Sequence, residues 1–160
     1  MSITISSIYF SPVKSISFQQ ISKCQIKRNI GIINDRLFAF SRLLESRQAQ
    51  IMEQDPSARN LINFLTLKNT PTLNKYSFEY NKGKLELFKN EKKLVSINPN
   101  NLDETRLLEK EISNLDSLVK SPVFLLKNKN KPFFDTNTGG EVMNSISLIN
   151  HNSIKDVEDK

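Results

Sequence analysis

The sequence contains a single cysteine, Cys24, and a single histidine, His151. One cysteine excludes a disulfide within the chain and any zinc site built from several cysteines. A signal peptide would show a basic region followed by an apolar run, and a transmembrane helix needs ~18 consecutive apolar residues. The sequence shows neither pattern. These absences predict a cytoplasmic protein that does not enter a membrane.

Several motifs that carry chemistry are also missing. The chain has no glycine-rich phosphate loop and no His/Cys/Asp cluster at metal-ligand spacing. With one histidine it also lacks a nucleophile–histidine–carboxylate set. We expect Cys24 to be a small buried hydrophobic residue and His151 to be solvated or packed. Any functional site must therefore be recognised from less common patterns.

The formal net charge is +6, which would suit anionic partners such as nucleic acid, a membrane surface or phosphorylated ligands. However, Asn, Lys and Ile make up about a third of the chain, and the 17 lysines outnumber the 6 arginines. An AT-rich coding sequence would produce the same bias. The basic residues are scattered and lack regular aromatic interleaving. These features argue against nucleic acid, although a small basic β-barrel that binds nucleic acid or another anionic partner remains the alternative function.

The 160 residues, 38% hydrophobic and 25% charged, suit one folded domain or one domain with part of a second. Short segments with alternating apolar residues predict a mainly β, barrel-like α+β fold with one or two helices. The clearest is a meander in which Tyr76, Phe78 and Tyr80 alternate before a turn at 81–83. Further predicted strands include 35–41, 63–67 and 123–126.

One helix is predicted from its cap and its period. Asn101 is a suitable N-cap, and Glu104 stands where a capping box needs an acidic residue. Leu108, Ile112, Leu115 and Val119 follow at helical spacing, and Pro122 is expected to end the helix. By contrast, segment 42–60 is polar, lacks a clean period and contains Pro56, so it is expected to be a long loop with at most one helical turn.

Four segments together resemble one known family. Residues 8–15 (IYFSPVKS) are similar to the opening of the N-terminal β-barrel of MOSC proteins, also called the molybdenum cofactor sulfurase middle domain. Residues 35–40 (DRLFAF) resemble its Asp-Arg strand, and 63–71 (NFLTLKNTP) resemble a later strand and turn. Residues 133–135 (FFD) with 145–150 (SISLIN) are similar to the start of the MOSC domain proper. The order and spacing of these segments match the family.

The resemblance implies a fold, a cofactor and a set of residues. Residues 1–127 would form the MOSC N-terminal β-barrel, and 128–160 would begin a truncated MOSC domain. The expected cofactor is the molybdenum cofactor, whose molybdopterin phosphate would contact Lys14, Ser15 and Arg36, with Asn144 and Ser145 as weaker candidates. A lysine, a hydroxyl and a forked guanidinium suit a phosphate dianion. In the alternative interpretation Lys14 is solvated and Arg36 pairs with a carboxylate such as Asp35 or Glu45.

The main departure from the family concerns the metal. MOSC proteins bind molybdenum through a cysteine far along the second domain, and Cys24 does not match that position. The chain is therefore expected to be inactive alone, whereas full-length relatives transfer sulfur or reduce N-hydroxylated compounds. Expected partners are molybdopterin or a sulfur-carrying small molecule, and a redox protein. A third interpretation is a non-functional remnant of low solubility, because an incomplete second barrel would expose strand edges.

Overall fold

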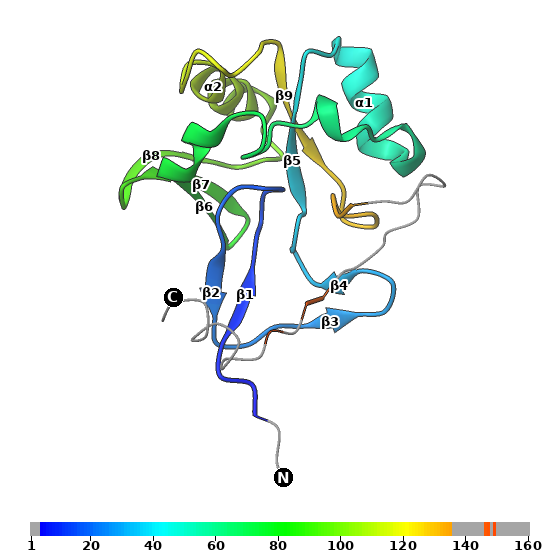
Figure 1. Ribbon diagram of the computed structural model, residues 1–160, viewed down its shortest axis with the longest axis vertical. Helices are drawn as coiled ribbons and strands as arrows, with labels where there is room; N and C mark the ends of the chain where they lie inside the picture. The colour runs from blue at the N-terminus through cyan, green and yellow to red at the C-terminus, as the bar shows by residue number, and fades with distance from the viewer. Residues whose placement is uncertain (1–3, 136–145, 148, 150–160) are drawn as a thin grey trace, which may run out of the picture.

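The computed structural model describes residues 4–135, 146–147 and 149, and these form mainly short strands in small sheets with two α-helices (Figure 1). This confirms an α+β fold rich in strands. The strands are β1 (Ile8–Phe10), β2 (Gln19–Ile21), β3 (Ile26–Lys27), β4 (Gly31–Ile32), β5 (Phe38–Arg42), β6 (Tyr76–Asn81), β7 (Lys84–Lys89), β8 (Lys92–Ile97) and β9 (Val123–Lys127). The helices are α1 (Ser46–Gln54) and α2 (Leu102–Ser113), with three 3₁₀ turns at Pro56–Ala58, Leu61–Asn63 and Pro71–Lys75.

Strands β6, β7 and β8 form the predicted meander. Lys82 and Gly83 connect β6 to β7 with φ values of 50° and 80°, and Asn90 and Glu91 connect β7 to β8 with 47° and 66°. Two consecutive residues at positive φ are the backbone of the tight turn that matches the twist of paired strands. The alternation predicted from the sequence is confirmed, because Phe78 is buried and its neighbours on either side are more exposed.

Strand β5 pairs antiparallel with β9 at the centre of the molecule. Nearly all of β5 is buried, which suits the apolar run of Phe38, Ala39 and Phe40. The outer edge of β9 is covered by carboxylates from both helices. The N–H of Leu125 donates to Glu109 of α2 at 2.7 Å, and the N–H of Lys127 donates to Glu53 of α1 at 2.8 Å. Two backbone donors on an unpaired strand edge are thereby satisfied.

Helix α2 begins where the sequence predicted but ends earlier. The side chain of Asn101 accepts from the N–H groups of Asp103 and Glu104. Glu104 does not complete a capping box with Asn101, since its carboxylate accepts instead from the N–H of Asn98 at 2.7 Å. The helix stops at Ser113, well before the proline expected to end it. The last two residues of the predicted apolar series, Leu115 and Val119, pack against the core from the turns that follow.

Two sequence predictions are wrong in the region that follows β5. Segment 42–60 contains the nine-residue helix α1, whose N-terminus is closed by the N–H of Glu45 donating to Gln48 at 3.1 Å. Its period is hidden because only Ala49 and Met52 are buried. The predicted strand 63–67 is not a strand, because Phe64 makes only an isolated bridge to β5. The prediction failed since a short apolar run does not by itself distinguish a strand from other buried segments.

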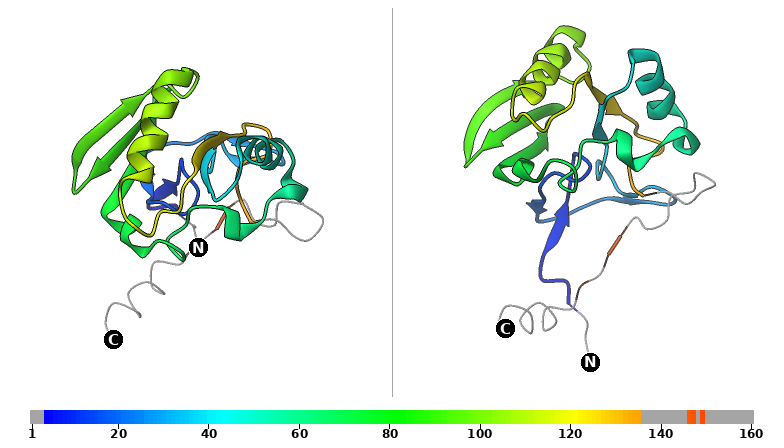
Figure 2. Two further views of the ribbon diagram at one scale, coloured as in Figure 1. Left: turned by 90° about the horizontal axis from the view of Figure 1, so that it is seen from above. Right: turned by 45° about the horizontal axis from the view of Figure 1, so that its top comes forward.

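The core lies between the meander, α2 and the β5–β9 pair, and a smaller cluster lies under α1. Figure 2 shows α2 between the meander and β9, and it contacts both β8 and β9. Residues 128–135 continue from β9 and pack against the preceding part of the chain. Phe133 is fully buried, and its N–H donates to the carbonyl of Arg36 at 2.8 Å. Most of the rest of the expected second domain lies outside the described residues. Neither helix in the described part of the chain is long and apolar enough to cross a membrane.

Candidate functional site

A cavity of about 750 Å³ is lined mainly by residues of segments 11–18 and 61–69, together with Arg36, Arg42 and Asp135. A volume of this size is typical of small-molecule sites. Four basic side chains and one acidic side chain line it, among apolar and hydroxyl-bearing residues. The lining residues are Ser11, Lys14, Ser15, Ile16, Ser17, Phe18, Arg36, Arg42, Leu61, Ile62, Thr66, Leu67, Lys68, Asn69 and Asp135. The structure therefore brings Lys14, Ser15 and Arg36, three candidates from the sequence, to one cavity.

Lys14 is held in place by the segment that follows β9. Its Nζ donates to the carbonyl oxygen of Phe133 at 3.1 Å and to Oδ1 of Asp135 at 2.8 Å. The side chain of Lys14 is only 7% exposed, whereas that of Asp135 is 70% exposed. Lys14 is therefore not the solvated loop residue of the alternative interpretation. Two of its three N–H donors are used within the protein, which leaves one donor for a ligand.

Arg36 is positioned by the buried carboxylate of Asp35. Asp35 Oδ2 accepts from Nη1 of Arg36 at 2.5 Å, and Asp35 Oδ1 accepts from the N–H of Ser11 at 2.8 Å. Burial raises the pKa of Asp35, although the Ser11 N–H and the charge of Arg36 act in the opposite direction. The ion pair of the alternative interpretation is therefore present. It uses one N–H of a guanidinium that has five, and the described residues offer the other four no acceptor.

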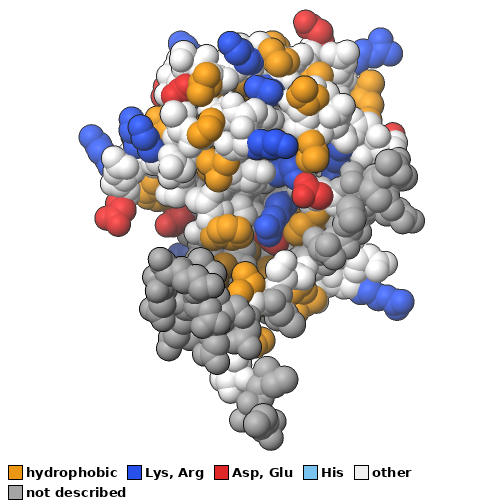
Figure 3. Space-filling view, viewed as in Figure 1, with side chains coloured by type: hydrophobic (Ala, Val, Ile, Leu, Met, Phe, Trp, Pro, Cys, Tyr) orange, Lys and Arg blue, Asp and Glu red, His pale blue; other side chains and the backbone are white. Residues whose placement is uncertain are grey.

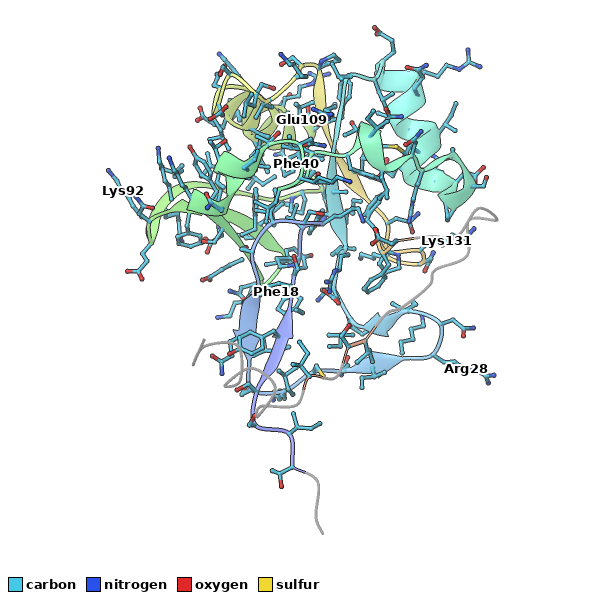
Figure 4. All side chains as sticks on the ribbon, in the orientation of Figure 1. Phe18, Arg28, Phe40, Lys92, Glu109 and Lys131 are labelled. Carbon is cyan, nitrogen blue, oxygen red and sulfur yellow. The ribbon has the colours of Figure 1, made fainter. Side chains whose placement is uncertain are left out.

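Two phenylalanine rings flank the guanidinium of Arg36. Its Cζ lies 5.7 Å from the ring centroid of Phe18 and 5.2 Å from that of Phe134. The side chain of Phe18, labelled in Figure 4, is 67% exposed and also lines the cavity. An exposed aromatic ring beside a fixed guanidinium offers a stacking surface next to an anion-binding group.

The backbone around the cavity is unusual. Ser15, Ser17 and Arg36 all have positive φ, at 60°, 52° and 48°. Residues other than glycine seldom adopt this left-handed conformation, and such positions are concentrated in functional sites. Hydrogen bonds hold the loop in place: the N–H of Arg36 donates to the carbonyl of Ser11 at 2.6 Å, and the N–H of Lys14 donates to that of Phe38 at 2.9 Å.

Other predicted residues do not contribute to the cavity. Asn144, Ser145 and His151 lie outside the described residues. Cys24 is partly exposed rather than buried and does not line the cavity. The expectation of a buried Cys24 is therefore wrong. In the part of the chain that the structure describes, no three His, Cys, Asp or Glu side chains lie together as metal ligands would.

The sequence did not identify Arg42, Lys68 or Asp135 as cavity residues. Lys68 and Asp135 stand within the motifs at 63–71 and 133–135 without a predicted role, and Arg42 begins the segment predicted to be a loop. The missing signal is distance along the chain, because these residues meet the loop at 11–18 only after β5, β9 and the 3₁₀ turn at 61–63 have packed. The spacing of residues within one segment does not predict contacts between segments that are distant in the sequence.

Electrostatically the cavity suits an anion. Its four cations face one exposed carboxylate, and its hydroxyl groups add neutral donors. Figure 3 shows hydrophobic and uncharged surface interspersed among the lysines and arginines of this face. Within the cavity, four cationic groups are available to one small ligand. They fit the phosphate of the cofactor implied by the motifs, whereas the described residues supply no cysteine to its metal.

Comparison of the chain with protein-family models, with curated proteins and with solved structures found no match. The assignment to the MOSC family stays a prediction from the sequence motifs.

Proposed function

We propose that the cavity binds the phosphate of a molybdopterin-type cofactor. The observation that carries the proposal is that Lys14 and Arg36, distant in sequence, line one cavity together with Ser15. A phosphate dianion is bound most strongly by charge-assisted hydrogen bonds, and a guanidinium can supply two in parallel. The exposed ring of Phe18 would stack on the planar pterin.

Arg36 would provide the principal phosphate contact. Asp35 fixes its Nη1, so the side chain is oriented before the ligand arrives and little conformational entropy is lost on binding. Lys14 would add a second positive charge. Asp135 now occupies one donor of Lys14, and its carboxylate can turn into solvent when a phosphate takes its place.

The barrel-like arrangement of the family is also part of the proposal. In the described residues the sheets are separate, and side chains link two of them: the N–H of Phe78 donates to Ser17 Oγ at 3.0 Å, and that of Tyr80 donates to Gln19 Oε1 at 3.3 Å. On the other side, α2 lies between β8 and β9. A ring of strands in which α2 fills one gap is supported by these contacts.

The test is to purify the chain and measure bound pterin by mass spectrometry after acid extraction. The wild-type protein is expected to retain a phosphorylated pterin, and Arg36→Met is expected to lower its content about tenfold or more, since a charge-assisted hydrogen bond contributes ~1.5–3 kcal/mol. Arg28→Met is the control, because Arg28 lies on the β3–β4 turn away from Phe18 (Figure 4).

Two outcomes would contradict the proposal. One is the absence of pterin from both the wild-type chain and the same chain incubated with excess cofactor. The other is equal pterin content in the Arg36 and Arg28 variants, which would place the pterin outside the cavity.

A further inference from the structure

The cavity lining has two basic residues, Arg42 and Lys68, that the phosphate proposal does not use. Arg42 is the last residue of β5, and Arg36 lies two residues before its first, so the length of β5 separates them along the chain. The four steps from Phe38 to Arg42 span ~13 Å at the rise of an extended strand. Both arginines nevertheless line the same cavity.

Arg42 is oriented from the segment that crosses β5. Its Nε donates to the carbonyl oxygen of Ile62 at 3.1 Å, and among the described residues its two terminal nitrogens have no acceptor. The crossing segment is itself fixed to the strand, because the N–H of Leu65 donates to the carbonyl of Phe40 at 2.9 Å. Arg42 is thus held at one nitrogen, as Arg36 is at the other end.

Lys68 stands on a hydrogen-bonded turn and also lines the cavity. Asn69 Oδ1 accepts from the N–H of Thr66 at 3.0 Å, and Asn69 Nδ2 donates to the carbonyl of Phe64 at 2.8 Å. These bonds hold residues 66–69 in place and set Lys68 in the cavity lining beside Leu67. Within the described residues, Lys68 forms no ion pair.

Apolar side chains form much of the remaining cavity wall. Leu61, Ile62 and Leu67 line it with exposures of 58%, 63% and 39%, and Ile16 forms part of the wall from the core side. Apolar side chains left exposed inside a concave site gain free energy when a ligand covers them. The wall therefore suits the uncharged middle of a ligand that reaches both ends.

We infer that Arg42 and Lys68 form a second anion subsite, and that the cavity binds an elongated small molecule with an anionic group at each end and an apolar or aromatic middle. This inference rests on the proposed function, because the first anionic group is the phosphate at Arg36. It adds the chemical class of the whole ligand. A single-headed anion would leave Arg42, which Ile62 orients, and Lys68 without an anionic partner.

The test uses isothermal titration calorimetry with three probes: decyl phosphonate, which has one head, decamethylene bisphosphonate, which reaches from one end of β5 to the other, and ethylene bisphosphonate, which is too short. Wild-type protein is expected to bind decamethylene bisphosphonate about tenfold tighter than either other probe, since the second head adds charge-assisted hydrogen bonds within one molecule. The double variant Arg42→Met/Lys68→Met is expected to lose that advantage and to bind decyl phosphonate as the wild type does.

The matched control is Arg28→Met/Lys92→Met, which removes the same charge at the β3–β4 turn and at the first residue of β8, both apart from Phe18 (Figure 4). It should retain the advantage of the long bisphosphonate, and circular dichroism should show that both double variants are folded. If decyl phosphonate binds in an Arg36-dependent way but the long bisphosphonate binds no tighter, the second subsite is wrong and the phosphate proposal stands. If no probe binds, or if binding is insensitive to Arg36→Met, both fail.

Discussion

Arg59 binds the segment at 131–133, which leads to Asp135 of the cavity lining, and its replacement should destabilise the whole fold. Its Nη1 donates to the carbonyl of Pro132 at 2.8 Å, and its Nη2 donates to that of Lys131 at 2.6 Å. Its Cζ lies 4.3 Å from the ring centroid of Phe133. The guanidinium thereby attaches the segment that supplies the partners of Lys14. Burial lowers the pKa of Arg59 to about 10, so it stays charged near neutral pH.

The same side chain ends helix α1. A continued helix would satisfy the carbonyl of Met52 from the N–H of residue 56, but that residue is Pro56, which has no N–H. Arg59 Nε supplies the missing donor at 3.2 Å, and Nη2 reaches the carbonyl of Glu53 at 3.4 Å. Arginine near a helix C-terminus also interacts favourably with the helix dipole.

We expect Arg59→Met to lower the free energy of unfolding by about 4 kcal/mol: the two short hydrogen bonds from a charged donor contribute ~1.5 kcal/mol each, and the contact with the Phe133 ring ~1 kcal/mol. Arg59→Lys keeps the charge and one donor within reach, so its loss should be about half as large. The side chain of Arg106, 68% exposed and 3.8 Å from Asp103, provides the control. Arg106→Met should stay within about 0.5 kcal/mol of the wild type.

The assay is urea unfolding followed by far-ultraviolet circular dichroism, because the chain has no tryptophan to report on unfolding. The slope of the transition should be the same for all four proteins, so that the midpoints compare stability directly. A loss below about 1 kcal/mol for Arg59→Met would refute the reasoning, since it would approach the ~0.5 kcal/mol that surface substitutions alone produce. Equal losses for the methionine and lysine variants would show that the donors and the charge do not matter.

Three further predictions each concern a single residue. Asp135→Asn should tighten phosphonate binding several-fold to about tenfold, because Lys14 loses its internal counterion, and weaker binding in calorimetry would contradict this. Burial raises the pKa of Glu109 in the folded state above its unfolded value. The resulting stabilisation is fully present below the unfolded pKa and is lost as pH rises through the folded pKa. Glu109→Gln keeps an acceptor for Leu125 and should therefore gain stability over the wild type as pH rises from about 4 to about 7 in urea titrations; a difference independent of pH would oppose the assignment. Gly83→Ala should cost about 1 kcal/mol, because φ is 80° there and nothing lies within 4 Å of the added methyl group, and an unchanged thermal midpoint would count against it.

Local patterns in the sequence determined the elements that depend on near neighbours. The meander follows from alternation and from turns such as Lys82–Gly83, and the start of α2 follows from Asn101. These features need only backbone geometry and hydrogen bonds between residues a few positions apart. Where α2 ends was not predictable in this way, because Leu115 and Val119 keep the apolar period while they pack from turns.

The tertiary structure alone decided the composition of the cavity. The sequence motifs brought Lys14 and Arg36 to attention, but their partners Asp135 and Phe133, and the second pair Arg42 and Lys68, come from segments that no spacing connects. Helix α1 was missed for a related reason, since its two buried residues face β9 and its end is satisfied by a later arginine. Which distant groups meet depends on the packing of β5 and β9, a sum of many weak contacts that no single stretch of sequence contains.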